Sequence, residues 1–568
     1  MASPRPARPA GHALVEALIE QGVTTAFGVP GESYLAVLDG FHAQRQRIRF
    51  VSCRHEGGAS FMAEAQGKLS GRPGICFVTR GPGASNAAIG LHTAFQDSTP
   101  MILFVGQVAS DQRDREAFQE VDYRQMFGPG TLGFAKWVAE VQSAARLPEY
   151  LARAFHTALQ GRPGPVVLAL PEDMLREPID AEVLARVEPA RAAPPAGAMA
   201  ALRRLLHDAE RPFVIAGGGG WNSGACADLQ RFAENWRLPV GCSFRAQDVF
   251  DNRHPGYAGD VGIGINPKLA ARIGDADLVV AIGCRLGEMT TGGYELLQPP
   301  RPRQRLVHIH PGAEELGRVY AADLAIHAAM PEAAAALAGL EPPARPRWAG
   351  WTEAAHADYE ANLVAPALEP LDLAEVVKTI QRLVPPDAIL ANGAGNFTGW
   401  LQRYYRYPGH CRYGRTQLAP TVGAMGYGLP AAVAAALLEP DRTVVNLAGD
   451  GDFLMTSQEL ATAIAHGAKR LVSIVVDNAS YGTIRMHQER EYPGRVSGSD
   501  LVNPDFAALA RAYGWWADGP IAETAGFEPA FRAALDAGRP ALLHLKLATD
   551  VITTRTTLGA IRAKALQG

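Results

Sequence analysis

Short apolar runs alternate with longer amphipathic segments along the whole chain. In the first third, the apolar runs 75–79 and 101–105 flank a helical pattern over 84–95. Unbroken apolar runs of this length, separated by helical segments, are typical of parallel strands that are covered by helices on both faces. The pattern therefore predicts an α/β protein built on parallel sheets.

The same alternation continues through the middle and last thirds. The predicted strands there are short, apolar and rich in β-branched residues, and the last two flank a helical pattern over 457–466. They are the segments 212–216, 278–282, 305–309, 443–447 and 471–476. We expect each third to form a doubly wound parallel sheet of its own.

Two stretches rich in Pro and Ala lack this periodicity and predict linkers. They are residues 187–197 and 339–348. They divide the chain into three domains, expected at 1–186, 198–340 and 366–555, and each is large enough to bury its own core.

The composition is that of a globular protein without a strongly charged surface. Of 568 residues, 47% are hydrophobic and 20% are charged, and the net charge is −4. This balance gives no electrostatic reason to expect a nucleic acid or a membrane as partner. No segment approaches the roughly 18 uninterrupted apolar residues of a membrane span, and residues 1–10 lack the apolar stretch of a secretory signal. We therefore expect a cytoplasmic protein.

Six scattered cysteines form no CxxC pair, and most of them lie in apolar runs. This distribution favours buried, reduced thiols over disulfides or a zinc site. The cysteines are Cys53, Cys76, Cys226, Cys242, Cys284 and Cys411.

The strongest chemical signal lies in the last third. The predicted strand 443–447 runs into Gly449, Asp450 and Gly451, and a second predicted strand ends just before Asn478. One helix and one strand fit between them, so the two strands are parallel and both side chains emerge at one sheet edge. Their oxygens suit Mg²⁺, which also takes diphosphate oxygens, and the glycines let backbone N–H groups approach a phosphate. Gly-Asp-Gly alone is also compatible with a simple turn, so the pairing with Asn478 carries the prediction.

Glu56 is a second candidate. It follows the apolar run 48–53 and precedes the small residues of a predicted helix start. The helix dipole favours a glutamate at this place whether or not it has a chemical role. A carboxyl group in such surroundings can also share a proton at neutral pH, as acid–base catalysis requires.

Together these elements resemble the thiamine-diphosphate (ThDP) enzyme family, in which Gly-Asp-Gly is followed by Asn and the first domain carries an Arg-His-Glu element. The resemblance implies that Asp450, Asn478 and the carbonyl oxygen of Ser480 bind Mg²⁺, and that Glu56 activates the pyrimidine ring of ThDP. The three domains would then be pyrimidine-binding, central nucleotide-binding-like and diphosphate-binding. The resemblance also implies a homodimer or homotetramer, because Glu56 serves the cofactor held by the last domain of another subunit.

Within that family the chain is most similar to the acetolactate synthases. The motifs that carry this resemblance are 27–31, 79–83 with Asn86, 117–120 and 423–430. The first lines the thiazolium ring in the family, and the second forms a turn of the first domain. By resemblance, Gly31, Gly81 and Asn86 therefore belong to the site.

The other two motifs imply individual roles. By resemblance, Phe118 and Gln119 face the substrate, Gly423 offers its carbonyl oxygen to the cofactor's amino group, and Met425 bends the cofactor. Without the resemblance, Phe118 and Met425 are also compatible with ordinary core positions.

Some residues depart from the synthase pattern. His487 stands where the biosynthetic synthases carry a Trp that shapes the choice of acceptor. His92 lies in a segment expected near the substrate, although a structural role is also compatible with it. Lys136 is a candidate for contacting a substrate carboxylate.

The middle third resembles the family's nucleotide-binding domain. Its glycine run 217–220 lacks the spacing of a dehydrogenase fingerprint. Residues 285–292 resemble a flavin-contacting motif but lack two of its acids, and His308 and His310 stand where the family has aspartates. The sequence leaves FAD binding open, and a flavin would be structural because the expected reaction transfers no electrons.

We therefore predict a ThDP-dependent carboligase of the acetolactate synthase type. It would decarboxylate a 2-oxo acid, pyruvate, and join the two-carbon unit to a second carbonyl compound. The alternatives are another ThDP-dependent lyase or decarboxylase, acting on an aryl 2-oxo acid, a hydroxyketone, a cyclic diketone or an acyl-CoA, and a non-catalytic homologue.

Overall fold

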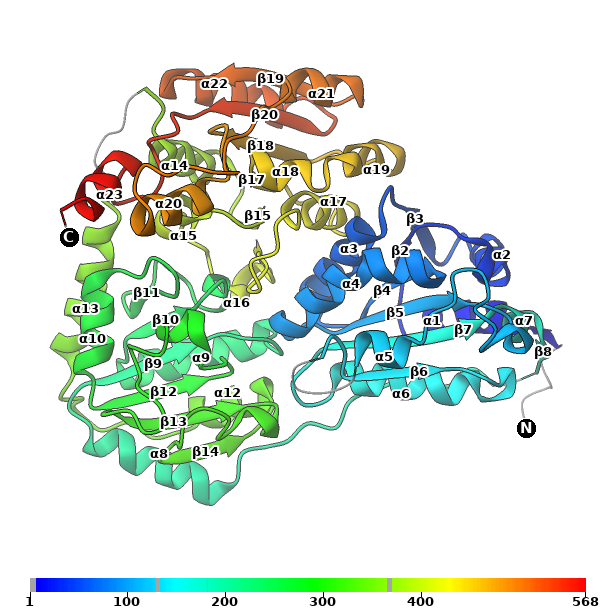
Figure 1. The fold of residues 1–568 in the computed structure, drawn as a ribbon. Helices are drawn as coiled ribbons and strands as arrows, with labels where there is room; N and C mark the ends of the chain where they lie inside the picture. Colours follow the sequence, from blue (N-terminus) through cyan, green and yellow to red (C-terminus); the bar gives the residue numbers. More distant parts are fainter. Residues whose placement is uncertain (1–6, 129–132, 181, 365–369, 568) are drawn as a thin grey trace. The chain divides into compact units, whose positions relative to one another are not determined.

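The computed structural model describes residues 7–128, 133–180, 182–364 and 370–567. Within them the chain forms three six-stranded parallel sheets and one short antiparallel pair, β1 (Arg8–Pro9) with β8 (Pro178–Ile179) (Figure 1). The chain divides into two compact units. The first contains Met1–Ala190 with the segments Leu429–Pro440 and Thr456–Ala468, and the second contains the remainder.

The first sheet has the strand order β3-β2-β4-β5-β7-β6. Helices α1 and α6 cover one face, where Phe77 and Phe104 enter the core, and α3 and α4 cover the other (Figure 1). The strands are β2 (Thr25–Gly28), β3 (Arg49–Ser52), β4 (Gly74–Thr79), β5 (Met101–Gln107), β6 (Trp137–Glu140) and β7 (Pro165–Pro171). The helices are α1 (Ala10–Glu20), α2 (Leu35–Ala43), α3 (Glu56–Ser70), α4 (Arg80–Asp97), α5 (Tyr123–Phe127), α6 (Leu147–Leu159) and α7 (Glu172–Arg176).

The central sheet has the order β11-β10-β9-β12-β13-β14, which is the order 3-2-1-4-5-6 of dinucleotide-binding folds. Its strands are β9 (Pro212–Ala216), β10 (Val240–Ser243), β11 (Tyr257–Val261), β12 (Leu278–Ile282), β13 (Arg305–His310) and β14 (Leu324–His327). The helices are α8 (Ala196–Asp208), α9 (Ser223–Trp236), α10 (Pro267–Asp275), α11 (Glu288–Thr291), α12 (Met330–Ala338) and α13 (Ala349–Asn362).

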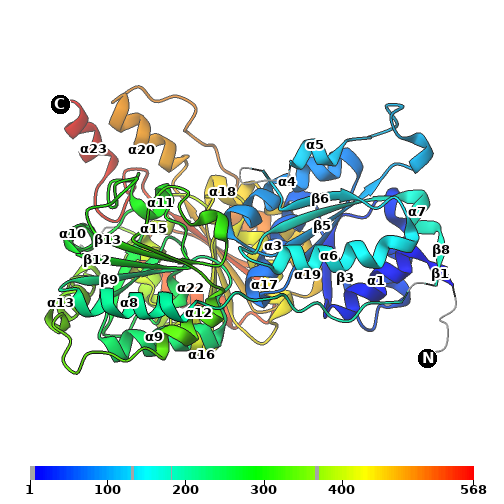
Figure 2. The same ribbon diagram turned by 90° about the horizontal axis from the view of Figure 1, so that it is seen from below.

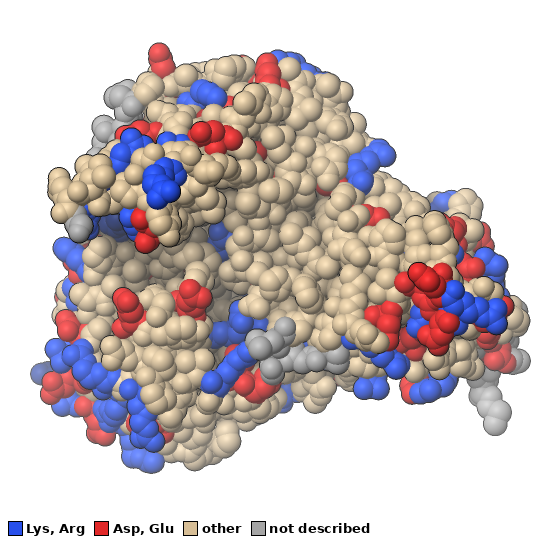
Figure 3. All heavy atoms as spheres, viewed as in Figure 1, with Lys and Arg blue, Asp and Glu red and all other residues tan. Residues whose placement is uncertain are grey.

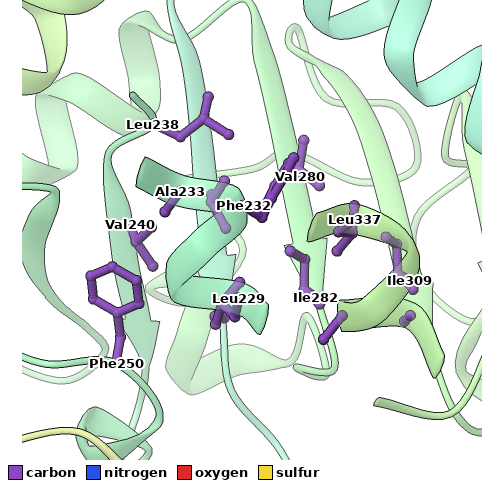
Figure 4. Packing of buried hydrophobic residues seen from close by; sticks show 14 of the residues in the cluster. Leu229, Phe232, Ala233, Leu238, Val240, Phe250, Val280, Ile282, Ile309 and Leu337 are labelled. Atoms are coloured by element: carbon purple, nitrogen blue, oxygen red, sulfur yellow. The ribbon is translucent and has the colours of Figure 1, made fainter. Parts of the chain in front are cut away.

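Successive residues of the central strands pack into cores on opposite faces. Val214 lies in the core with α8, α9 and α12, whereas Ile215 lies in the core with α10 and α13. Figure 2 shows α8 and α12 along one side of β9, β12 and β13. Figure 4 shows the α9 side chains Leu229 and Phe232 packed against strand residues such as Val280. The continuous apolar runs of these strands are therefore explained by burial on both faces.

The last sheet has the order β16-β15-β17-β18-β20-β19. Numbered along the chain, its strands repeat the order of the first sheet, 2-1-3-4-6-5. They are β15 (Ile389–Asn392), β16 (Gln417–Leu418), β17 (Val444–Gly449), β18 (Leu471–Asp477), β19 (Trp516–Ile521) and β20 (Ala541–Lys546). The helices are α14 (Leu373–Leu383), α15 (Thr398–Tyr404), α16 (His410–Tyr413), α17 (Gly428–Leu438), α18 (Asp450–Leu454), α19 (Leu460–His466), α20 (Gly482–Glu491), α21 (Phe506–Ala512), α22 (Thr524–Leu535) and α23 (Leu558–Ala565).

The predicted α/β class is confirmed, and every predicted strand coincides with a strand of the structure within two residues. The first linker is irregular only as far as Pro195, because α8 begins at Ala196. The expected turn at 79–83 is instead the start of α4, and the chain turns at Arg80 alone, whose φ is +43°. Pro82 is tolerated there because the first helical turn needs no N–H donor. The expected starts of the first and last domains, residues 1 and 366, lie outside the described residues.

Surface and membrane predictions can be compared with the structure only in part. On the face drawn in Figure 3, acidic and basic side chains are interspersed and large areas carry neither. No described helix combines the length and apolar character that crossing a membrane requires. All six cysteines are free and five are buried, as expected for cysteines that lie in apolar runs.

Candidate active site

The predicted residues of the first domain lie after four neighbouring strands of its sheet. Gly31 follows β2, Glu56 follows β3, Gly81 and Asn86 follow β4, and the loop with Phe118 and Gln119 follows β5. These four strands are adjacent in the sheet and parallel. The residues therefore gather at one carboxyl edge, where open α/β sheets bind ligands.

Glu56 is the first residue of α3, and His55 caps the helix by accepting a hydrogen bond from the N–H of Gly57 at 2.9 Å. Asn86 of α4 donates its side-chain amide to Oε2 of Glu56 at 2.9 Å. The two helices pack closely, because a Cβ at Gly90 would lie 2.3 Å from Oγ of Ser60. Close helix packing thus brings two predicted residues into direct contact.

Glu459 holds the backbone before Glu56. Its Oε1 accepts hydrogen bonds from the N–H groups of His55, at 3.0 Å, and Arg54, at 3.2 Å. A Cβ at Gly58 would lie 2.4 Å from the same oxygen, which explains the glycine. Burial raises the pKa of Glu459, although Thr462 and the two backbone groups donate to it. The sequence analysis missed this residue, because nothing near Glu459 in the chain points to Glu56.

A strained loop presents Phe118 and Gln119. Asp114, Glu116 and Gln119 have φ values of +60°, +53° and +66°, which are unusual for residues other than glycine. The carboxylate of Glu120 closes the loop by accepting hydrogen bonds from the N–H groups of Asp114, at 2.9 Å, and Ala117, at 3.0 Å.

The same loop is joined to the start of α4. The N–H of Gly81 donates to the carbonyl of Gln119 at 3.0 Å, and Arg113 donates to Glu120 at 3.0 Å. Phe118 is 72% exposed, so the alternative of a core position is wrong for this chain. Gly31 also lies in this region, where a Cβ would stand 2.3 Å from Cβ of Thr79.

In the last sheet, too, the predicted residues follow neighbouring strands at one edge. Gly423 and Met425 follow β16, the Gly-Asp-Gly tripeptide joins β17 to α18, and Asn478 follows β18. Strands β17 and β18 are parallel neighbours, with Gly449 opposite Val476. Asp450 and Asn478 therefore emerge side by side at one edge, as the spacing predicts. Met425 is only half-buried, which does not fit an ordinary core position.

Asp450 belongs to a buried polar network. The side-chain amide of Asn503 donates to Oδ2 of Asp450 at 2.7 Å and to Oδ1 of Asp477 at 2.8 Å. Asp477 also accepts from His544 at 2.9 Å and from Lys546 at 2.8 Å. Burial raises the pKa of Asp450. At Asp477 burial acts in the same direction, but the donors outweigh it and lower the pKa below its usual range.

The tripeptide and its surroundings are tightly packed. A Cβ at Gly451 would lie 2.5 Å from the ring of Tyr481, and one at Gly449 would lie 3.0 Å from the ring of Phe397. The N–H of Gly451 donates to Oδ1 of Asp450 at 2.9 Å, and the N–H of Ser480 donates to Oδ1 of Asn478 at 3.2 Å. Among the described residues, no three His, Cys, Asp or Glu side chains are clustered as for a metal. The predicted Mg²⁺ ligands are of a different kind, combining one carboxylate, one amide and one carbonyl, and hard oxygen donors of this kind suit Mg²⁺.

Three family models match this chain in the order of its three sheets. Residues 8–126 match the N-terminal TPP binding domain of thiamine pyrophosphate enzymes, residues 199–337 match their central domain, and residues 393–545 match their C-terminal TPP binding domain. The chain belongs to the thiamine pyrophosphate enzyme family. It is therefore a ThDP-dependent enzyme, thiamine pyrophosphate being another name for ThDP.

Its relatives in the thiamine pyrophosphate enzyme family include acetolactate synthases. The chain is 34% identical to the acetolactate synthase large subunit of Parasynechococcus marenigrum, over 88% of this chain and 82% of that protein. It is 31% identical to the probable acetolactate synthase large subunit of Methanocaldococcus jannaschii, over 89% and 86% of the two chains. It is 29% identical to the acetolactate synthase isozyme 2 large subunit of Escherichia coli, over 94% of each.

The three candidate substrate residues, Lys136, His92 and His487, have different surroundings. The ammonium group of Lys136 donates to the carbonyls of Gln160, at 2.7 Å, and Arg162, at 2.8 Å, and these bonds account for the lysine without a substrate. The ring of His92 packs edge-on against Phe134, at 5.4 Å between centroids. His487 is exposed on α20.

Close packing in the central domain accounts for its glycine run, residues 217–220. The indole N–H of Trp221 donates to the carbonyl of Gly217 at 2.8 Å, and a Cβ at Gly218 would lie 2.0 Å from the carbonyl oxygen of Gly283. His308 and His310 are buried, and their rings lie 5.8 Å apart. These contacts require the glycines whether or not a nucleotide binds, so the run itself does not argue for FAD.

Proposed function

We propose that the protein is a carboligase of the acetolactate synthase type that decarboxylates pyruvate and joins the two-carbon unit to a second carbonyl compound. The proposal depends above all on one observation, the hydrogen bond between Asn86 of α4 and Glu56 at the start of α3. The chain that carries this pair is similar to acetolactate synthases over most of its length. When bound, ThDP supplies a nucleophilic carbon and an electron sink for this chemistry. The chain's own residues bind and orient the cofactor and the substrates, and they move protons.

Glu56 is the proposed proton-sharing group for the pyrimidine ring. Asn86 holds its carboxyl group from one side, and Glu459 fixes the backbone that precedes it. The carboxyl group lies at the start of α3, and the hydrogen bond from Asn86 orients it. Gly423 is proposed to accept from the cofactor's amino group, and Met425 to set the cofactor's shape.

The diphosphate and Mg²⁺ are proposed to bind at the edge formed by β17 and β18. Asp450, Asn478 and the carbonyl of Ser480 would supply oxygen ligands, and Gly449 and Gly451 would let the backbone approach the phosphates. Asn503 supports this proposal, because its hydrogen bond orients the Asp450 carboxylate. The proposed reaction needs no FAD, and the absorbance spectrum of the purified protein would reveal whether a flavin is bound.

Phe118 and Gln119 are proposed to face the acceptor, with Gly31 and Gly81 keeping the wall behind them free of side chains. His92, Lys136 and His487 stay weaker candidates for substrate contact. We propose a homodimer or homotetramer in which Glu56 of one subunit serves the cofactor of another. The domain limits 1–186, 198–340 and 366–555 and a cytoplasmic location are likewise proposals.

A second candidate is another decarboxylase or lyase of the same family. The observation in its favour is His487, which is exposed on α20 at the position where the biosynthetic synthases carry a Trp. A non-catalytic role is disfavoured because Glu56, Asp450 and Asn478 are all retained.

The two candidates can be separated with purified full-length protein, ThDP and Mg²⁺. CO₂ release and acetolactate formation would be measured with pyruvate, and then with an aryl 2-oxo acid, a hydroxyketone, a cyclic diketone and an acyl-CoA as donors. The proposal expects acetolactate from pyruvate at a rate above every other donor. Turnover of another donor with none of pyruvate would reject it in favour of the second candidate.

A further inference from the structure

The segment after β16 is a short irregular stretch that carries Gly423 and Met425. It runs from Pro420 to Gly426 and ends where α17 begins at Gly428. Gly423 and Gly426 have φ values of +72° and +81°, so the backbone folds back twice at positions where only glycine is unstrained. Such a stretch has no helix or strand ladder to define its shape and needs contacts from elsewhere in the chain.

One contact holds the beginning of the stretch. The carbonyl oxygen of Pro420 accepts a hydrogen bond from the N–H of Gly423 at 3.0 Å, and a second one from the guanidinium group of Arg245. Arg245 comes from the central domain, just after β10, and is only 8% exposed. Its φ is +59°, which is strained for a residue with a side chain. Its guanidinium group also lies over the ring of Phe244, 4.9 Å from the centroid.

Another contact holds the end of the stretch. Oδ1 of Asp452 accepts a hydrogen bond from the N–H of Gly426 at 2.7 Å and a longer one, 3.3 Å, from the N–H of Ala394 after β15. Asp452 is the buried second residue after Asp450 in α18. The space around its carboxylate is limited, because a Cβ at Gly393 would lie 2.0 Å from Oδ1.

We propose that Arg245 and Asp452 are positioning residues that clamp the two ends of the stretch 420–426 and so set the backbone that presents Gly423 and Met425 to the cofactor. The inference rests on the proposed roles of Gly423 and Met425. Neither clamp residue needs to touch the substrate. Arg245 fixes the Pro420 carbonyl, Asp452 fixes the Gly426 N–H, and the residues between them have little freedom left.

The clamp gives the central domain a part in cofactor geometry. Arg245, just after β10, supplies one of the two anchors of a stretch that belongs to the last domain. The clamp also joins the segments that follow β15, β16 and β17. The N–H groups of Ala394 and Gly426 both donate to the carboxylate of Asp452.

The test uses full-length Arg245→Met and Asp452→Ala, with Arg245→Lys and Asp452→Asn as conservative variants. Arg442→Met is the matched control, because Arg442 also donates to main-chain carbonyls, those of Asp387 and Arg415, which lie outside the stretch. For each protein we would measure the Kd for ThDP at saturating Mg²⁺, the C2-proton exchange rate of bound ThDP, and the Tm without cofactor.

We expect both severe variants to weaken ThDP binding about tenfold to a hundredfold, since each loses a buried hydrogen bond that shapes the site. Their C2-proton exchange should also slow at saturating cofactor, and Asp452→Asn, which keeps the acceptor oxygen, should recover part of both. The double variant should lose less than the product of the single effects, because both residues act on one stretch.

Several outcomes would overturn the clamp. One is that both severe variants keep the ThDP affinity and the C2-proton exchange rate of the wild type. Another is that their changes in ThDP affinity and exchange rate are no larger than those of Arg442→Met at an equal loss of Tm. A wild-type protein that exchanges the C2 proton but fails to turn over pyruvate would reject the proposed reaction and leave the clamp standing. The two failures are therefore distinguishable.

Discussion

The first and last domains share the strand order 2-1-3-4-6-5, and both carry candidate residues after the second, third and fourth strands along the chain, yet the two edges differ in their residues. At the first edge, the carboxyl group of Glu56 is held by the amide of Asn86. The last edge gathers Asp450, Asp452 and Asp477 around backbone N–H groups and the amide of Asn503.

Under the proposed function, one topology serves the two halves of one cofactor. A single carboxyl group with one amide donor is suited to sharing a proton with a neutral ring. Several carboxylates with amide and carbonyl oxygens nearby are suited to a divalent cation and, through it, to a diphosphate. The fold supplies the edge in both cases, and the residues placed after the strands decide its chemistry.

The largest effect is expected from a substitution of Glu56, which tests the proposed role of the first edge. Glu56→Gln keeps the shape and the contact with Asn86 but cannot ionise, so the C2-proton exchange rate of bound ThDP should fall by about 10²- to 10⁴-fold. Exchange would be followed by NMR after rapid quenching, at saturating ThDP. Glu149→Gln, at an exposed position of α6, is the control and should exchange like the wild type. Equal exchange in both variants would remove Glu56 from its proposed role.

The last edge is tested by Asp450→Asn and Asn503→Ala. The first removes the proposed ligand charge, and the second removes the amide that orients it, so Mg²⁺-dependent ThDP binding should weaken about tenfold to a hundredfold in each. Titration of ThDP at several Mg²⁺ concentrations measures this. Asp505→Asn, which alters only the cap of α21, should bind normally. If Asp450→Asn kept its Mg²⁺ dependence, the proposed metal site would be wrong.

Glu120 tests whether the strained loop of the first edge matters for substrate. Glu120→Ala removes the acceptor for Asp114 and Ala117, and the loop should relax from its left-handed conformations. We expect kcat/KM to fall about tenfold, because the loop that presents Phe118 and Gln119 loses the hydrogen bonds that close it, and ThDP affinity should stay unchanged. A fall in ThDP affinity with an unchanged KM would instead assign the loop to the cofactor.

The smallest effect is expected at Glu489, near the end of α20. Glu489 accepts from Arg562 of α23 at 2.7 Å and from Arg485 at 3.2 Å, and the bonds from Arg562 lower its pKa to about 2. The ionised form is thus favoured by folding, so this stability is present above about pH 4.5 and is lost as the pH falls towards 2.

Arg562→Met should therefore lower the free energy of unfolding at pH 7, because Glu489 loses its partner for ionisation. Denaturant unfolding at pH 7 and pH 3 would measure this loss, and the difference from wild type should shrink at the lower pH. A difference that does not change with pH would show that Arg562 acts through packing alone.

The sequence predicted those parts of the fold and site that depend on local pattern. Strands such as β9 and β12 were predictable to the residue, because a strand buried on both faces is an unbroken apolar run. The convergence of Asp450 and Asn478 followed from one βαβ unit. Asn86 and Glu56 are 30 residues apart, and only the resemblance placed both in the site.

The missed residues act across long stretches of chain. Glu459 meets His55 over 404 residues, and Arg245 meets Pro420 over 175. No periodicity or spacing encodes such contacts, because they depend on how whole elements pack. The expected turn after β4 was missed for a local reason, since the left-handed φ of Arg80 lets α4 begin at once.

The central claim is that the two edges are halves of one active site contributed by different subunits. The direct test is to co-express Glu56→Gln and Asp450→Asn chains with different tags, purify the mixed dimers, and measure acetolactate formation from pyruvate. Each variant alone should be inactive, whereas a mixed dimer keeps one site with both groups intact. We predict about half of the wild-type activity for purified mixed dimers. Mixed dimers as inactive as the single variants would contradict the account.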